Sequence, residues 1–250
     1  MTDPAQSFAE VLATLEDELD WRLLGENYCH DGGELFFPPE QIEAQRDAGL
    51  VIAGALGEEL AQLPERLGRS LYVGAGVAEL VPILAESLVL GREVVILNLE
   101  GPEPRELNRA LAATEERCDV SLPRIQWCEV ETLAGEFDHG WLVSVINDPE
   151  AFPALHDVLY ERQTEGAPGP GELEENSARA TVLVRALLAK LSRNALLSTT
   201  DEELPFLAPL LAEANCTATI VKGTFLTPIV GDPLRFVWLA GAADPESPPD

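Results

Sequence analysis

Two glycines separated by one residue follow a short apolar run in the segment LYVGAGVA, residues 71–78. Because glycine has no Cβ, the backbone at Gly74 and Gly76 can turn sharply and let a ligand approach the main chain. A helix expected after the turn adds free backbone N–H groups, which favour polar or anionic ligand groups. The same spacing also occurs in buried strand-to-helix turns that serve packing alone, so a ligand site and a structural turn both stay open here.

Polar side chains follow three later apolar runs, at the places where strands are expected to end. Asn98 and Glu100 follow the second strand, Glu131 follows the third, and Asn147 and Asp148 follow the fourth. Open parallel sheets bind ligands outside the carboxyl ends of their strands, so these residues are expected to share one crevice with the glycine turn. In so acidic a chain, Glu100 and Glu131 are equally well explained as solvated loop residues, and Asp148 as part of an Asp-Pro turn before a helix.

The hydrophobic pattern predicts an α/β fold. Helical spacing of apolar residues predicts N-terminal helices over residues 5–25 and 40–67, and from residue 71 onward strands and helices alternate. Such alternation is typical of a parallel sheet with helices on both faces. The predicted strands span residues 71–73, 93–99, 125–130, 141–146, 194–198, 218–225 and 234–240. One predicted helix follows the first strand and ends near residue 90, and the others span 104–114, 151–162, 177–191 and 205–214.

The last two predicted strands are joined by the short segment TPIVGDP, residues 227–233. A parallel connection needs a crossover of a dozen or more residues, whereas this segment is long enough only for a hairpin. The strand over 234–240 is therefore expected to pair with 218–225 and to run antiparallel to its neighbours. The prediction is a seven-stranded, mostly parallel sheet that ends in a reversed strand.

The composition bounds the class of protein. A chain of 250 residues with 46% hydrophobic residues can bury one large core. No apolar run is long enough to cross a bilayer, and the first residues lack a secretory pattern, so we expect a cytoplasmic protein without a membrane partner. Four scattered cysteines without a C-x-x-C pair argue against a metal site and against a disulfide framework.

Charge is the extreme feature of the composition. The chain has 44 acidic and 16 basic residues, a net charge of −28, and its only lysines are Lys190 and Lys222. A surface this acidic repels phosphate backbones, and no basic stripe is present, so no nucleic-acid partner is expected. The scarcity of lysine fits a protein from a salt-rich cytoplasm and equally a GC-rich genome.

Two further segments are interpreted as loops. Cys29, His30 and Asp31 place a thiol, an imidazole and a carboxylate side by side, but the glycines that follow predict a loop rather than a catalytic cluster. The segment 164–176 is rich in Gly, Pro and Glu and has almost no apolar side chains, so a mobile solvated loop is expected in preference to a lid.

The element order, the glycine turn and the closing hairpin resemble class I S-adenosylmethionine-dependent methyltransferases, whose seven-stranded sheet finishes with a reversed strand. The resemblance covers about residues 40–240. It implies a Rossmann-like domain over residues 40–243, with an N-terminal helical extension over 1–39 and an acidic C-terminal tail over 244–250. It also implies S-adenosylmethionine as cofactor and methyl transfer to a small-molecule or protein acceptor as the activity.

The resemblance gives cofactor roles to several positions. Gly74 and Gly76 match two glycines of the family motif, Ala78 stands at the third, and Tyr72 replaces the preceding acid. Asn98, matching the acid that ends the second strand of the family, would face the ribose hydroxyls.

Two acids complete this cofactor side. Glu100, two residues beyond Asn98, is the other candidate for the ribose, and Glu131 would stand near the adenine.

On the acceptor side, Asn147 and Asp148 stand where amino-group methyltransferases keep an Asn/Asp-Pro-Pro-aromatic motif. Here the second proline and the aromatic residue are absent, so the motif does not identify an amine acceptor. Both residues would still border the transferring methyl group. Asp148 is the candidate base if the nucleophile must lose a proton.

Two alternatives stay open. The replacements at Tyr72, Ala78 and Asn98 favour a methyltransferase-like interaction module without cofactor chemistry. A nicotinamide-dependent oxidoreductase is disfavoured, because Glu79 occupies the place of the third glycine that the dinucleotide-binding motif requires.

Overall fold

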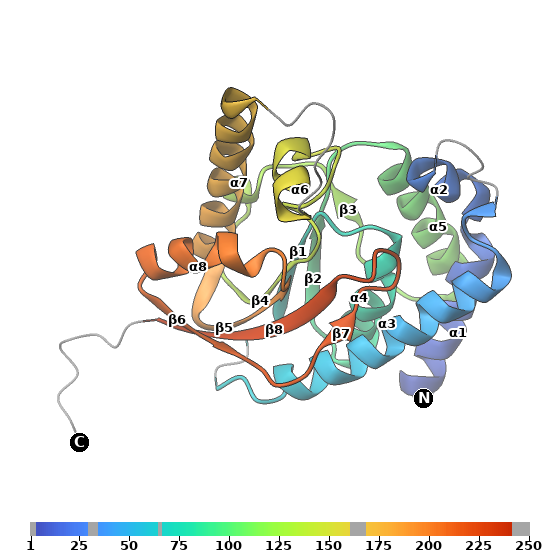
Figure 1. Ribbon diagram of the computed structural model, residues 1–250. Helices are drawn as coiled ribbons and strands as arrows, with labels where there is room; N and C mark the ends of the chain where they lie inside the picture. The colour runs from blue at the N-terminus through green and yellow to red at the C-terminus, as the bar shows by residue number, and fades with distance from the viewer. Residues whose placement is uncertain (1–3, 30–34, 65–66, 161–168, 242–250) are drawn as a thin grey trace, which may run out of the picture.

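The computed structural model describes residues 4–29, 35–64, 67–160 and 169–241, and Figure 1 shows its α/β architecture. Seven of the eight strands of the sheet follow the order β3-β2-β1-β4-β5-β8-β6, and the eighth, the short β7, pairs with β8. The strands are β1 (Arg69–Val73), β2 (Glu93–Leu97), β3 (Ile125–Gln126), β4 (Phe137–Leu142), β5 (Leu191–Thr200), β6 (Cys216–Ile220), β7 (Phe225–Leu226) and β8 (Pro233–Gly241).

The strand directions confirm the predicted topology. Strands β3, β2, β1, β4 and β5 are mutually parallel, whereas β8 lies antiparallel between β5 and β6. Ile220 pairs with Val237 and Thr217 with Ala240, as expected, but the single strand predicted over 218–225 is divided into β6 and β7. Seven strands form the continuous sheet, and β7 is a two-residue addition.

Helices cover both faces of the sheet (Figure 1). Leu71 packs with α6, α7 and α8 on one face, and the next residue, Tyr72, packs with α1, α3, α4 and α5 on the other, as the two-residue period of a strand requires. None of the helices in the described ranges is both long and apolar enough to cross a bilayer. The helices are α1 (Pro4–Glu18), α2 (Trp21–Tyr28), α3 (Pro39–Leu60), α4 (Leu80–Leu84), α5 (Pro102–Cys118), α6 (Pro153–Leu159), α7 (Pro170–Lys190) and α8 (Leu204–Glu213), with short turns η2 (Val77–Glu79), η3 (Ala85–Val89) and η4 (Val130–Thr132).

Several element boundaries differ from the sequence prediction; the helix expected over 40–67, for example, ends at Leu60. The single helix expected over 5–25 is split into α1 and α2, since the Asp20 carboxylate accepts a hydrogen bond from Leu23 N at 3.0 Å and begins a new helix. The third strand, expected to reach residue 130, ends at Gln126, and Val130 lies in a 3₁₀ turn.

The fourth strand is β4, Phe137–Leu142, rather than the predicted 141–146. Beyond it, Ser144 has a φ of +55°, and the N–H groups of Val145 and Ile146 donate to the buried Glu203 carboxylate at 2.7 and 3.0 Å. The apolar run therefore continues as a buried turn, whose N–H groups are satisfied by a side chain instead of a neighbouring strand.

The predicted loop over 164–176 is partly helical. Helix α7 begins at Pro170, and the Glu172 carboxylate accepts a hydrogen bond from Gly169 N at 3.1 Å, which caps the helix. Residues 161–168, His30 and Asp31, and the C-terminal tail lie outside the described residues.

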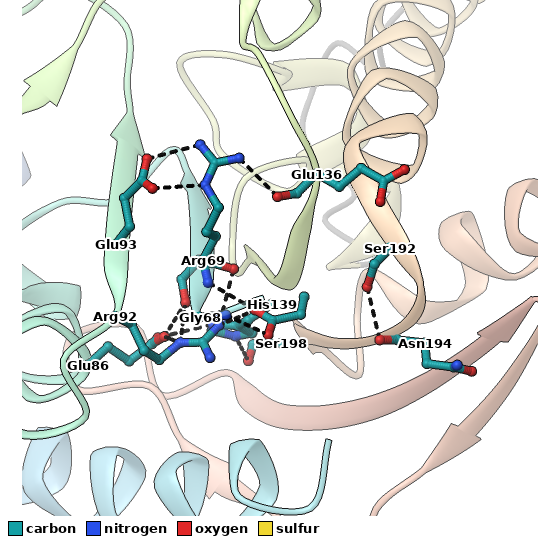
Figure 2. Close-up of polar contacts among 12 residues, drawn as sticks. Gly68, Arg69, Glu86, Arg92, Glu93, Glu136, His139, Ser192, Asn194 and Ser198 are labelled. Atoms are coloured by element: carbon teal, nitrogen blue, oxygen red, sulfur yellow. Dashed lines mark hydrogen bonds and ion pairs between the residues drawn. The ribbon is translucent and has the colours of Figure 1, made fainter. Parts of the chain in front are cut away.

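A buried polar network connects β1 and β4 with the turn η3, which contains Glu86 (Figure 2). The Arg92 guanidinium forms ion pairs with Glu86, at 2.8 Å, and with Asp138, and these three side chains are almost fully buried. Glu86 also accepts a hydrogen bond from the Tyr72 hydroxyl at 2.6 Å and lies 3.0 Å from His139 Nδ1. Burial by itself raises the pKa of Glu86, but His139, Arg92 and Ser70 lower it to about 2.

Candidate functional site

The glycine turn lies at the carboxyl end of β1, against the turn that follows β4. Gly74 has a φ of +73°, and a Cβ at this position would lie 2.7 Å from Val145 Cγ2. Its N–H donates to Leu97 O at 2.8 Å, which ties the turn to the end of β2. Gly74 is exposed, whereas Gly76 is buried and extended, and Ala78 lies in the 3₁₀ turn η2. A non-glycine residue at Gly74 would be strained, and the turn brings three strand ends together.

Two carboxylates of the chain accept the N–H groups of this turn. Glu79 accepts from Gly76 N at 2.8 Å, and Glu103, from the first turn of α5, accepts from Val77 N at 2.8 Å. The Tyr28 hydroxyl of α2 donates to the same Glu103 oxygen at 2.9 Å. Burial raises the pKa of Glu79 to about 8, so this side chain is protonated at neutral pH. Burial also raises the pKa of Glu103, and the charges of Asp148 and Glu150 add to the increase.

Asn98 lies beside the glycine turn, as the sequence predicted. Its Nδ2 donates to Ala75 O at 2.8 Å, and its Oδ1 accepts from Leu99 N at 2.7 Å. The amide keeps one N–H and one oxygen lone pair for a ligand.

Glu100 and Glu131, the two acids predicted to stand beside the cofactor, lie on the surface of the protein. Glu100 is exposed and forms an ion pair with Arg105 at 2.6 Å. Glu131 is also exposed, and its backbone oxygen accepts from Lys190 Nζ at 3.1 Å. Among the described contacts, neither side chain reaches the glycine turn.

The turn after β4 carries Asn147 and Asp148, the two residues predicted to border an acceptor. Asp148 Oδ1 accepts from the N–H groups of Glu150 and Ala151 at 2.8 and 2.6 Å, which is the structural turn that the sequence analysis kept as an alternative. Asn147 is buried, and its Nδ2 donates to Tyr160 Oη at 2.7 Å and to Asp232 Oδ2 at 3.1 Å. Its Oδ1 has no hydrogen-bond partner in the described part of the chain.

Sequence reasoning missed Asp232, which holds this turn in place. Besides Asn147, its Oδ2 accepts from Ser144 Oγ at 2.8 Å and from the Tyr160 hydroxyl at 2.6 Å. Asp232 lies in the hairpin connection before β8, and only the glycine and proline that flank it mark the position in the sequence. The hairpin thus positions the acceptor-side turn as well as reversing the strand.

Apolar side chains at the ends of β2 and β3 were also missed. Leu99 is 71% exposed and Trp127 is 50% exposed, next to Asn98 and to the end of β3 respectively. Exposed apolar side chains beside the carboxyl ends of parallel strands are suited to contact a flat aromatic ligand group.

A second chemically suggestive arrangement lies inside the core. His139 Nε2 is 3.0 Å from Ser198 Oγ, and His139 Nδ1 is 3.0 Å from Glu86, which is the order of groups in a serine-hydrolase triad. Ser198 and His139 are fully buried, so a substrate has no access to the hydroxyl, and the arrangement belongs to the structural network of Figure 2. Within the described ranges, the chain also has no cluster of three or more His, Cys, Asp or Glu suited to a metal ion.

The strand order and the glycine turn can now be compared with known proteins. No family model and no curated protein matches the sequence. Magnesium protoporphyrin IX methyltransferase of Synechocystis PCC 6803, crystallised with bound S-adenosylmethionine, aligns with a TM-score of 0.50 at 15% identity, over 90% of this chain and 98% of that chain. The same enzyme with bound S-adenosylhomocysteine aligns with a TM-score of 0.47 at 14% identity, over 80% of this chain and 84% of that chain. A putative O-methyltransferase from Klebsiella pneumoniae aligns with a TM-score of 0.43 at 13% identity, over 97% of this chain and 92% of that chain.

The first of these likenesses and the strand order define the class of fold. The sheet is the Rossmann-like sheet of class I methyltransferases, with its parallel strands in the order 3-2-1-4-5 and a reversed strand inserted before β6. The fold expectation is confirmed. Because a shared fold does not fix an activity, ligand and reaction must be argued from the site.

Proposed function

We propose that this chain binds S-adenosylmethionine at the glycine turn and transfers its methyl group to a small-molecule or protein acceptor. The observation that carries the proposal is the position of the turn: it lies at the carboxyl end of β1, between β2 and β4, where open α/β sheets bind their ligands. The similar structure with bound S-adenosylmethionine supports the same assignment.

The residues at this edge fit the parts of such a cofactor. Gly74 is exposed, so a ligand can reach its main chain beside the Val145 side chain that fills the place of a Cβ. Asn98 would contact the ribose hydroxyls with its remaining N–H and lone pair. The exposed Leu99 and Trp127 offer apolar surface for the adenine, with Glu100 and Glu131 on its solvent side.

Methyl transfer from S-adenosylmethionine needs few catalytic groups from the protein. The sulfonium of the bound cofactor supplies an activated methyl group, so the chain mainly has to hold the acceptor in line and exclude water. Asn147 and Asp148 would border the acceptor, and the buried Asn147 would position this turn through its hydrogen bonds to Tyr160 and Asp232. Asp148 Oδ1 is engaged in its turn, and its second oxygen would serve as the base for an acceptor that loses a proton.

A non-catalytic interaction module is the second candidate function. Tyr72, at the position of the family acid, is fully buried and donates to Glu86 instead of facing the crevice. The chain's own carboxylates also accept the N–H groups of Gly76 and Val77. A protein that no longer binds the cofactor could have acquired both features, and a binding measurement separates the two functions.

Gly76→Val is expected to abolish binding of S-adenosylmethionine with a modest loss of stability. The residue has a φ of −119°, which valine adopts without strain. A Cβ would lie 2.7 Å from Glu103 Oε1, so the new side chain displaces that carboxylate and fills the space above the turn. Loss of the Glu103 hydrogen bonds costs about 1–2 kcal/mol.

Calorimetric titration of wild type, Gly76→Val and Gly54→Val is the measurement. Gly54 lies on the exposed side of α3 with open space around it, so Gly54→Val controls for the substitution itself. Equal affinity of wild type and Gly76→Val would place the ligand elsewhere.

A further inference from the structure

The Glu103 carboxylate has an unusual environment. Its side chain is half-buried, and Oε1 accepts two hydrogen bonds, from Val77 N and from the Tyr28 hydroxyl. Both donors are neutral, and Oε2 has no hydrogen-bond partner among the described residues. Oε2 is not among the fully buried oxygens without a partner, so this oxygen of Glu103 is open to water or to a ligand above the glycine turn.

Three buried acids of the chain are paired with a cation, whereas Glu103 is not. Glu86 and Asp138 share the guanidinium of Arg92, and Glu106 pairs with Arg109 at 2.7 Å. Within the ranges that the structure describes, no cationic side chain pairs with Glu103. Its charged neighbours are Asp148 and Glu150, whose negative charge raises its pKa further. A proton or a cation from outside the chain would balance the negative charge at this group.

The carboxylate lies directly over the glycine turn. A Cβ on Gly76 would be 2.7 Å from Glu103 Oε1 and 3.4 Å from Oε2, so the absence of a side chain at Gly76 gives the carboxylate its place. An acid in the first turn of α5 is also favoured by the helix dipole. That effect does not explain the contacts, because Glu103 bonds Val77 and Tyr28 rather than the N–H groups of its own helix.

We infer that Glu103 binds the α-ammonium group of S-adenosylmethionine, supplying from α5 the carboxylate that Tyr72 does not supply from β1. The inference rests on the proposed function. An ammonium can donate a hydrogen bond to the open Oε2, whereas the sulfonium has no hydrogen to donate, so the ammonium is the matching cation. Tyr28 and Val77 orient the carboxylate through the other oxygen.

The test compares three ligands on three forms of the protein by calorimetry. S-adenosylmethionine and S-adenosylhomocysteine both carry the ammonium, and 5′-methylthioadenosine lacks the amino-acid part. Glu103→Gln removes the charge and keeps the shape, and Glu116→Gln, an exposed acid on the same helix, is the matched control. We expect Glu103→Gln to weaken the binding of S-adenosylmethionine and S-adenosylhomocysteine about tenfold or more, as the loss of a charge-assisted hydrogen bond does. The affinity for 5′-methylthioadenosine should not change.

Each other outcome has a defined meaning. Unchanged affinity for all three ligands would show that Glu103 does not contact the cofactor. Tighter binding of the ligands by Glu103→Gln would show that the carboxylate obstructs the ligand. A loss of affinity confined to S-adenosylmethionine would show that the carboxylate contacts the sulfonium. Either result overturns the inference. If wild type binds none of the ligands, the proposed function fails and the inference fails with it. If wild type binds and only the effect of the variant is missing, the proposed function stands alone.

Discussion

Replacing Arg92 by methionine is expected to lower the free energy of unfolding by about 3–5 kcal/mol, the range for breaking a buried ion pair. The side chains of Arg92, Glu86 and Asp138 are 7%, 1% and 0% exposed, so the variant leaves two carboxylates buried without their cation. Methionine has a similar length, so the loss reports charge more than packing.

Urea unfolding measured by circular dichroism gives this free energy directly. Arg185→Met is the control, since the ion pair between Arg185 and Glu213 is 60% and 58% exposed and its loss should be barely measurable. A cost below about 1 kcal/mol for Arg92→Met would mean that the network does not hold β1 and β4 together in the way that Figure 2 suggests.

Replacing Glu79 by glutamine is expected to stabilise the protein at pH 8 and to have no such effect at pH 4. The pKa of Glu79 is about 8 in the folded chain and 4.5 as its ordinary value, so between these values the folded chain binds a proton that the unfolded chain has lost. Stability is therefore lost as the pH rises through this window. Glutamine cannot ionise and keeps an acceptor for Gly76 N.

The gain at pH 8 should be on the order of 3 kcal/mol, because each pKa unit corresponds to about 1.4 kcal/mol and local relaxation recovers part of the cost. The free energy of unfolding of wild type, Glu79→Gln and the exposed control Glu116→Gln, measured in steps from pH 4 to pH 8, tests this. Parallel curves for wild type and Glu79→Gln would contradict the burial of an ionisable carboxyl at this position.

The sequence predicted the fold well because its signals are local. Alternating apolar runs and helical spacing follow from the neighbours of each residue, and the short TPIVGDP connection makes β8 run antiparallel to β7, the strand that precedes it. Boundaries were less predictable: Val145 and Ile146 continue an apolar run, and only the distant Glu203 carboxylate makes them a turn.

The candidate site was predicted only in outline, for the same physical reason. Gly74, Gly76 and Asn98 lie together because they end neighbouring strands, which the strand order requires. Tyr28 and Glu103 are 75 residues apart in sequence, and nothing near either residue marks their hydrogen bond. The proline on each side of Glu103 indicates a helix start, not a carboxylate over the glycine turn.

Binding of S-adenosylmethionine to the wild-type protein is the most direct test of the central claim. Titration calorimetry with S-adenosylmethionine, S-adenosylhomocysteine and NAD should show one site per chain for the first two, in competition with each other, and no binding of NAD, because Glu79 stands where the dinucleotide motif needs its third glycine. Absence of binding by S-adenosylmethionine and S-adenosylhomocysteine would contradict the account and favour the interaction module, and binding of NAD alone would favour an oxidoreductase.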